Sequence, residues 1–502
     1  MSCKVLNLQG KWTKERGTSV SGNHKNPPKV INLALLLIIS ILGFGYIHSL
    51  NRNLYRNLYY KYTDLVYFEQ SLANFIHGHG LVDTGRGEDR SLFSEHAYFT
   101  HFLISLPVYY LFPKTLTLFS IATIHILVGL IIVFFLAQML LKNIVLAWIC
   151  YFLFLMNTFI LINAGCLWPF GFHSEVYYLP YFLGLLYFWD RNKKIALACF
   201  FLALLTKETY TIPLFLTMFY FLIKNKREKR TAITLMAVSF LYFILATKWL
   251  IPFFGSGKTA YNYYALRFDA LRTLDLQMFL KLFLHYWKLL LIHFHFLPVF
   301  SPQILVLGLP DSLINTLSRF VLHYNIPPNP ASWHSIPVLG FLIWTYLETF
   351  RKLTKLLKKQ IFVYLFSLVL ISFSVYLFLD SPIPRLTHYK GNKNLLISLK
   401  EAKKIMTNSN SLCVEWDLAG PFMQKRYLYN FPVNYQKAEY ILLRPSDKNF
   451  SKIKDIHYEI ILKTPQLVLL KKLDTGQVNP RKKSSREGAD ILACPGLKWP
   501  ES

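Results

Sequence analysis

The chain has 502 residues, of which 53% are hydrophobic and 17% aromatic, and it carries a formal net charge of +28. Apolar runs of about 20 residues, long enough to cross a hydrocarbon core, recur along it and indicate a polytopic α-helical membrane protein. Basic residues of such proteins gather on cytoplasmic loops, so the charge does not indicate nucleic-acid binding. The six cysteines show no metal-ligand or redox spacing and imply no disulfide framework.

The N-terminal segment 1–29 contains many Lys and Arg residues against the single acid Glu15, which predicts a cytoplasmic N-terminus. The apolar run 30–50 is too long for the core of a signal peptide and has no small-residue cleavage site, so we expect a retained first span.

A polar segment follows and forms the large external loop 51–114. Its Asp, Glu, His and Arg side chains reach a density that no bilayer core accepts, and we expect it to be partly helical. The apolar stretch 101–112 is too short to span and is predicted to lie in the membrane interface.

The rest of a transmembrane domain at 30–379 is predicted from further apolar runs, which bring the total to about eleven spans. Basic turns at 190–194, 224–230 and 351–359 mark the cytoplasmic side, so the C-terminal side is external. The least regular run is 303–321, because Pro310, Asp311 and Arg319 interrupt it. The expected further spans are 115–141, 144–162, 176–189, 195–206, 209–223, 231–252, 279–298, 303–321, 335–350 and 361–379.

Segment 380–473 lacks the long apolar runs of the preceding chain, and its pattern predicts a small external α/β domain. A helical period at 395–406 precedes strand-like runs. Residues 474–502, rich in Lys, Arg, Ser, Gly and Pro, have the composition of a disordered tail. The strand-like runs are 411–416, 439–443, 457–462 and 466–470.

Two carboxylates in the first external loop, Asp64 and Glu69, are candidate general bases. Aromatic neighbours would partly desolvate a carboxylate there, which suits it to take a proton from an acceptor hydroxyl. The alternative is structural: Asp64 caps a helix that begins near Leu65, and Glu69 is solvated.

Lys207 and Glu208 lie between two apolar helices, where ionisable residues are costly unless they are paired, hydrated or used. They either form an ion pair at the tip of a hairpin or serve a substrate. In the second case Lys207 binds the phosphate of a lipid-linked substrate, and Glu208 positions Lys207 or a hydroxyl.

His96, His173 and Glu175 would form a divalent-metal set, for Mg²⁺ or Mn²⁺, if the two external loops met. Hydrogen-bonded or interfacial histidines are the alternative. His334, at the outer start of a predicted span, is a weaker candidate of the same kind.

A series of short motifs resembles the bacterial membrane family DUF2079, over about residues 30 to 473. The motifs are Tyr62-Thr63-Asp64-Leu65, Phe68-Glu69-Gln70, Gly78-His79-Gly80, His96, Leu106-Pro107, Leu111-Phe112-Pro113, Phe170-Gly171-Phe172-His173-Ser174-Glu175, Lys207-Glu208, Leu309-Pro310, Leu313-Ile314-Asn315, His334 and the run 427–432.

The layout of that family is similar to GT-C glycosyltransferases, which use polyprenyl-phosphate sugars and place a catalytic carboxylate in the first external loop. The resemblance implies that Asp64 is this carboxylate, and that Lys207 holds the donor phosphate together with Arg86 or Arg90. It also implies a bacterial inner-membrane location. His173-Ser174-Glu175 replaces the acidic pair found in many such enzymes, which leaves metal dependence open. A non-catalytic transporter, lipid-binding protein or scaffold is the alternative.

Overall fold

A computed structural model of the chain describes residues 5–6, 12–13, 28–61, 63–85, 90–225, 228–255, 275–321, 330, 332–357, 359–450, 452–453 and 457–473. The chain divides into two compact units, Met1–Gly43 and Phe44–Ser502. In the first unit, β1 (Val5–Leu6) pairs antiparallel with β2 (Trp12–Thr13), and helix α1 (Pro28–Arg56) begins. The predicted tail 474–502 lies outside the described residues.

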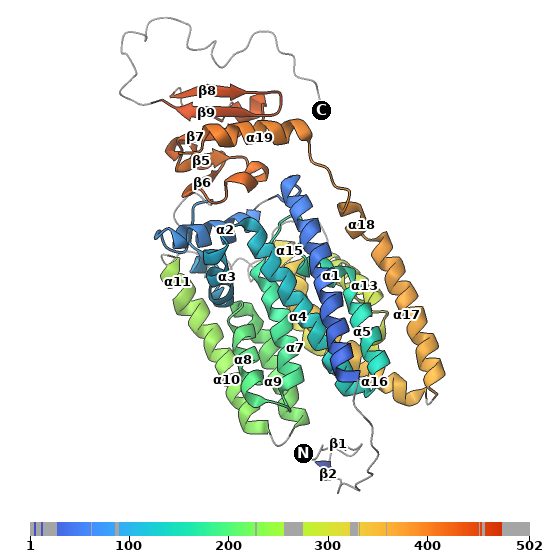
Figure 1. Ribbon diagram of the computed structural model, residues 1–502. Helices are drawn as coiled ribbons and strands as arrows, with labels where there is room; N and C mark the ends of the chain where they lie inside the picture. The colour runs from blue at the N-terminus through green and yellow to red at the C-terminus, as the bar shows by residue number, and fades with distance from the viewer. Residues whose placement is uncertain are drawn as a thin grey trace, which may run out of the picture. The chain divides into compact units, whose positions relative to one another are not determined.

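The second unit consists of a helical part and a small sheet domain at its C-terminal end (Figure 1). Most of the helices that follow α1 are 11 to 27 residues long, and apolar residues predominate in most of them. They are α2 (Thr63–Ile76), α3 (Phe99–Leu111), α4 (Thr115–Leu141), α5 (Ile144–Leu155), α6 (Thr158–Ala164), α7 (Tyr178–Phe188), α8 (Lys193–Leu204), α9 (Thr211–Lys224), α10 (Lys229–Leu245), α11 (Ile251–Phe254), α13 (Leu276–His293), α14 (Pro302–Leu305), α15 (Leu309–Val321), α16 (Ile336–Leu356) and α17 (Gln360–Asp380).

Four helical stretches among the described residues are long and apolar enough to cross a membrane: Val30–Arg56, Thr115–Leu141, Lys229–Phe254 and Gln360–Asp380. The total of about eleven spans stays a prediction, because most other helices are shorter than 18 residues. Helix α3 agrees with the predicted short interfacial segment.

Two predicted spans are broken helices. In the first, the Asn157 side chain accepts hydrogen bonds from the N–H groups of Phe159 and Ile160, so it ends the run of α5 and caps α6. In the second, the 3₁₀ turn Val306–Gly308 separates α14 from α15. Pro310 falls in the first turn of α15, where its missing N–H costs no helical hydrogen bond.

The C-terminal domain has a five-stranded sheet in the order β6-β5-β7-β9-β8. Strand β5 is parallel to β6 and β7, whereas β9 is antiparallel to β7 and β8. The predicted helix and four predicted strands are confirmed, and the four-residue strand β6 is an addition that the sequence pattern does not predict. The elements are α18 (Pro382–Leu386), α19 (Lys393–Ile405), β5 (Ser411–Val414), β6 (Tyr427–Asn430), β7 (Tyr440–Leu443), α20 (Asp447–Phe450), β8 (Tyr458–Lys463) and β9 (Val468–Lys472).

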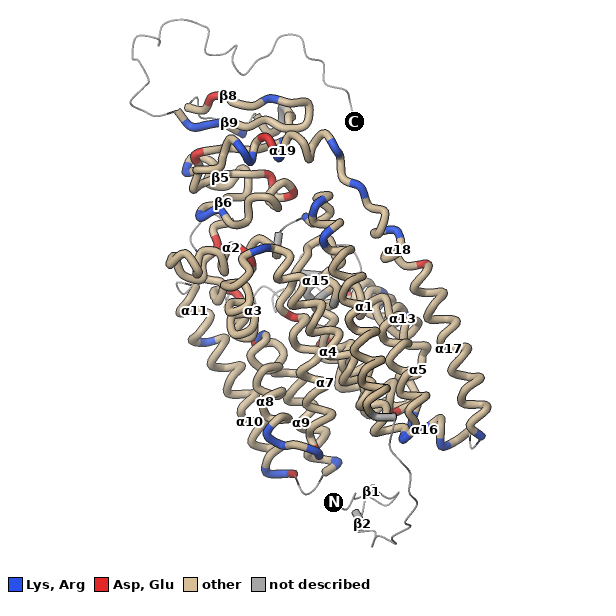
Figure 2. The backbone as a smooth tube through the Cα atoms, viewed as in Figure 1, with Lys and Arg blue, Asp and Glu red and all other residues tan. Residues whose placement is uncertain are grey.

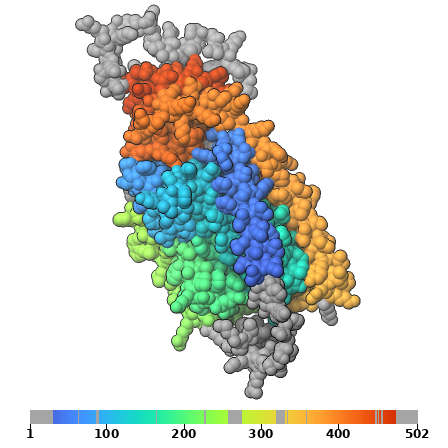
Figure 3. Space-filling model, in the orientation of Figure 1, coloured from blue at the N-terminus to red at the C-terminus, as the bar shows by residue number. Residues whose placement is uncertain are grey.

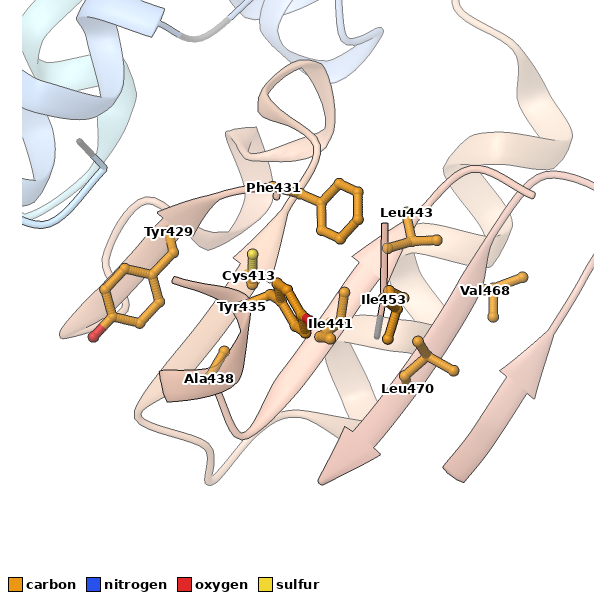
Figure 4. Packing of buried hydrophobic residues seen from close by; sticks show 10 residues of the cluster. All are labelled: Cys413, Tyr429, Phe431, Tyr435, Ala438, Ile441, Leu443, Ile453, Val468 and Leu470. Carbon is orange, nitrogen blue, oxygen red and sulfur yellow. The ribbon is translucent and has the colours of Figure 1, made fainter. Parts of the chain in front are cut away.

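One face of this sheet builds the core of the domain. Cys413, Ile441 and Leu470 come from three adjacent strands and are at most 2% exposed. Aromatic side chains from the segment after β6, including Phe431 and Tyr435, close over them (Figure 4). Apolar burial on this scale stabilises the domain in water, which supports a folded unit outside the bilayer.

We expect Ile441→Ala to lower the free energy of unfolding of this domain by about 2–4 kcal/mol, because it leaves a cavity in a fully buried site. Amide hydrogen exchange of the strands in the full-length protein measures the effect. The matched control is Ile397→Ala, at a side chain that is 54% exposed. Equal effects of the two substitutions would contradict the core described here.

Candidate active site

The tip between α8 and α9 presents Lys207 and Glu208 to opposite sides. Lys207 has extended backbone angles, φ −165° and ψ 142°, so successive side chains point apart. Thr100 of α3 fixes the tip, since its N–H bonds to Leu205 O at 3.0 Å and its hydroxyl to Leu202 O at 2.8 Å. The two residues therefore do not form the hairpin-tip pair considered from the sequence.

Gly171 brings the second external loop against α2. Its φ is +80°, and a Cβ at this position would lie 3.2 Å from Leu65 Cδ2. Only glycine adopts this conformation without strain at so close an approach. The loop that follows carries His173 and Glu175 to the helix end that carries Asp64.

These segments enclose a cavity of about 170 Å³. It brings together six of the candidates, because Asp64, His96, His173, Glu175, Lys207 and His334 all line it. Sequence reasoning missed several further lining residues, although the carboxylates among them belong to the same polar loop. These are Tyr67, Phe68, Asp83, Ser91, Leu92, Ser94, Glu95 and Tyr98.

His173 lies between two carboxylates. Its Nε2 is 3.3 Å from Asp64 Oδ2, and its Nδ1 is 3.7 Å from Glu175 Oε2. Burial disfavours an imidazolium, but the two carboxylates outweigh it and raise the pKa of His173 above its ordinary value. Asp64, whose side chain is 29% exposed, contacts His173 at the edge of the cavity.

Asp64 is not the N-cap of its helix. Helix α2 begins at Thr63, so Asp64 is its second residue and lies in the first turn. A carboxylate there is stabilised in its charged form by the helix dipole.

Lys207 pairs with Glu175 rather than with its neighbour. Its Nζ donates to Glu175 Oε1 at 2.9 Å, and the side chains are 6% and 1% exposed. Burial would raise the pKa of Glu175, but Lys207 and His173 hold it well below its usual range. Both members of the pair are therefore charged inside the protein.

Glu208 positions His96. Its Oε1 lies 2.6 Å from His96 Nδ1, and its Oε2 accepts the N–H of Ala97 at 3.0 Å. Burial and the positive charge of Lys207 lower the pKa of His96, which favours the neutral ring. Because a carboxylate can only accept, Nδ1 carries the proton and Nε2 is the basic nitrogen.

A second, small cavity of about 20 Å³ adjoins the first through His96, Lys207 and His334, which line both. It adds Asp311, one of the residues that interrupt the predicted span 303–321. Asn315 Nδ2 donates to Asp311 Oδ2 at 3.3 Å and to the carbonyl of His334 at 2.6 Å. This bond ties α15 to the start of α16.

Glu69 does not line either cavity. It is fully buried, and its Oε1 accepts hydrogen bonds from Tyr109 (3.2 Å), Thr115 (3.0 Å) and Gln424 (3.3 Å). The alternative that it is solvated is therefore wrong. Five residues rotate a helix by about 140° relative to Asp64, so the two carboxylates of α2 point to different environments.

The remaining candidates are not brought into the site as predicted. Arg86 lies outside the described residues. Arg90 faces Glu95 at 3.9 Å, and both side chains are about one-third exposed. No group of three or more His, Cys, Asp or Glu side chains in the described parts of the chain is arranged to hold a metal ion. His96 is turned to Glu208 instead of joining His173 and Glu175, so a divalent metal stays a prediction.

The C-terminal domain packs on the helix that carries Asp64 (Figure 3). Gln70 Nε2 donates to the carbonyls of Lys425 (3.1 Å) and Arg426 (3.2 Å), and Asn74 Nδ2 to that of Arg426 (3.4 Å). The rings of Tyr67 and Trp416 lie 5.8 Å apart. Because Tyr67 lines the cavity, the domain supports one wall of the site.

Comparison with known proteins identifies a family. The model of the family described as "Predicted membrane protein (DUF2079)" matches residues 54–488. No curated protein matches the chain. Among solved structures, ArnT from Cupriavidus metallidurans, bound to undecaprenyl phosphate, matches at 12% identity and a TM-score of 0.49, over 89% of this chain and 99% of that one. These values do not identify a shared activity.

Removal of the buried cation tests the ion pair. We expect Lys207→Met to destabilise the protein by about 3–5 kcal/mol, because it leaves Glu175 charged and unpaired. Glu175→Gln added to this variant should restore part of the loss. Denaturation of the purified protein measures both. Arg444→Met, in an ion pair whose side chains are 44% and 42% exposed, is the control and should cost about 1 kcal/mol or less. Equal losses of stability in Lys207→Met and Arg444→Met would contradict a buried ion pair between Lys207 and Glu175.

The burial of Glu69 should make the free energy of unfolding depend on pH. Burial raises its pKa from 4.5 to about 7, so the folded protein keeps a proton that the unfolded chain releases. Its contribution to stability is complete below pH 4.5 and is lost as the pH rises to 7, by about 3 kcal/mol.

Glu69→Gln, which imitates the protonated acid, should therefore be more stable than the wild type at pH 8 and nearly equal to it at pH 5. Melting temperatures at the two values test this. Glu401→Gln, at an exposed acid on α19, should leave the difference unchanged. A pH-independent gap between Glu69→Gln and wild type would exclude a proton on Glu69.

Proposed function

The chain belongs to the DUF2079 family of predicted membrane proteins, and we propose that it is a membrane-embedded glycosyltransferase. It would transfer a sugar from a polyprenyl-phosphate donor to an acceptor hydroxyl outside the cytoplasm. The observation that carries the proposal is the meeting of Asp64, His173 and Lys207 in one cavity. A base and a cation on one cavity are the two groups that such a transfer needs.

In the proposed reaction Asp64 is the general base. The acceptor hydroxyl gives its proton to the Asp64 carboxylate while its oxygen attacks the anomeric carbon of the donor sugar. The bond from that carbon to the phosphate oxygen breaks, and its electron pair leaves with the polyprenyl phosphate. His173 acts by positioning Asp64 at the cavity, where His173 Nε2 lies 3.3 Å from Asp64 Oδ2.

Lys207 is the proposed ligand of the donor phosphate. Its ammonium group lines the cavity and has three donors, so it can bind an anion while the pair with Glu175 persists. His96 supports it: a phosphate near Nε2 would favour the imidazolium form, whose Nδ1–H stays on Glu208. His334 completes this side, because it lines both cavities next to Lys207.

The charge distribution supports an external site. Helices α8 and α9 place Lys207 and Glu208 at one end, and the other end carries Lys193, Lys224 and the start of α10 at Lys229. Figure 2 shows basic positions gathered at that second end. By the positive-inside rule it is cytoplasmic, so the cavity and the C-terminal domain are external. We propose the bacterial inner membrane as the location.

We expect Asp64→Asn to reduce transfer by about 10²- to 10⁴-fold, since the amide cannot take the acceptor proton. Mass spectrometry of lipid-linked sugars and glycans, compared between a deletion strain and strains that express each variant, measures it. Asp380→Asn, at an exposed acid at the end of α17, is the matched control and should behave as wild type.

Two outcomes would count against this function. Unchanged products from Asp64→Asn at normal protein levels would remove Asp64 as the base. If, in addition, no polyprenyl phosphate copurifies, a non-catalytic transporter, lipid-binding protein or scaffold becomes the better description.

A further inference from the structure

Two further cavities lie beside α19, one of them between this helix and the end of α1, and neither shares a residue with the cavity of Asp64. The first, which we call the α1–α19 cavity, has a volume of about 240 Å³. Its lining is Tyr55, Arg56, Leu58, Leu396, Leu399, Lys400, Lys403 and Pro421. The second, of about 300 Å³, shares Lys403 and Pro421 with it and adds Lys425 and Arg426.

The charges of the α1–α19 cavity are all positive. Arg56, Lys400 and Lys403 contribute three cations and no acid lines the cavity. Within the described residues, no carboxylate lies within 4.0 Å of these three groups. Like charges that converge repel one another. The carboxyl group of Glu69 interacts electrostatically with Lys403 but is held in its own hydrogen bonds to Tyr109 and Thr115, so an anion bound between the three cations would be stabilised.

Lys425 extends this charge beyond the cavity. Its Nζ is anchored on the last carbonyls of α19, with Met406 O at 2.6 Å. Burial and the neighbouring charge of Lys403 lower the pKa of Lys425, against the opposite effect of Glu439. Lys403 therefore has a second cation beside it, on the side away from Arg56.

Apolar side chains complete the cavity and distinguish it from a site for a soluble anion. Leu396, Leu399, Lys400 and Lys403 follow the i, i+3, i+4, i+7 pattern, so they share one face of α19. Leu58 faces them from the chain just after α1. A ligand that fills this cavity needs a negative head and an adjoining hydrocarbon part.

The position of the cavity indicates where such a ligand comes from. The membrane-crossing stretch Val30–Arg56 ends at Arg56, which is itself a lining residue. The cavity thus opens where a helix leaves the bilayer, at the depth of phospholipid head groups. Figure 2 shows basic positions at this end of α1 and along α19.

We propose that the α1–α19 cavity binds an anionic phospholipid. Arg56, Lys400 and Lys403 surround its phosphate, and Leu58, Leu396 and Leu399 contact the glycerol and the first acyl carbons. A bound lipid would bridge α1 and α19. Helix α1 already contacts the C-terminal domain, because Tyr55 Oη donates a hydrogen bond to Gly420 O at 3.1 Å. This site is independent of the proposed transfer reaction.

The test is lipid binding by the full-length protein in detergent, followed by native mass spectrometry. Phosphatidylglycerol should bind more tightly than phosphatidylcholine, and Lys400→Gln/Lys403→Gln should weaken it by about tenfold or more, since each cation adds to the attraction. The matched control is Lys393→Gln/Lys404→Gln. It removes the same charge from exposed positions on the same helix that do not line the cavity, and it should bind as wild type.

Three results would overturn the proposal. Equal weakening in both double variants would mean attraction by general positive charge. Equal affinity for phosphatidylcholine would remove the phosphate as the recognised group. Displacement of the lipid by millimolar glycerol phosphate or inorganic phosphate would identify a site for soluble anions. Because Asp64 lies elsewhere, Asp64→Asn should bind phosphatidylglycerol unchanged, whatever its transfer activity.

Discussion

Charge compensation around Glu175 is the constraint on which the site depends. A carboxylate that is 1% exposed is strongly disfavoured unless cations approach it. Two do so: Lys207 from the α8–α9 tip, and His173 from the loop that also carries Glu175. His173 in turn contacts Asp64. Three separate segments are thereby connected to one another by alternating charges at the cavity.

Helix α2 divides its two carboxylates between two tasks. Asp64 faces the cavity, whereas Glu69 turns to Tyr109, Thr115 and Gln424 and joins the membrane part to the C-terminal domain. A movement of the C-terminal domain would therefore be transmitted to Asp64 through helix α2, which carries both carboxylates. The C-terminal domain is thus connected through α2 to the cavity of Asp64, although Glu69 and Gln424 lie 355 residues apart in the sequence.

Much of this organisation can be predicted from the sequence, because the periodicity of apolar residues and the polar residues that interrupt it are visible within short segments of the chain. They predict most helices, the small sheet domain and the common side of Asp64, His96, His173 and Lys207. The partners of these groups are not local. Lys207 and Glu208 are adjacent in the sequence, which suggests an ion pair between them. The extended backbone at Lys207 instead directs Lys207 to Glu175 and Glu208 to His96. Likewise, no pattern in the sequence indicates that Asn157 begins a new helix inside an unbroken apolar run.

The contact between α2 and the C-terminal domain relies on main-chain groups of the domain. Gln70 and Asn74, one helical turn apart, bind the carbonyls of residues 425 and 426 and not their side chains. Main-chain carbonyls are the same for nearly every amino acid. Substitutions at 425 and 426 can therefore change the charge at these positions while the main-chain acceptors that hold α2 stay in place.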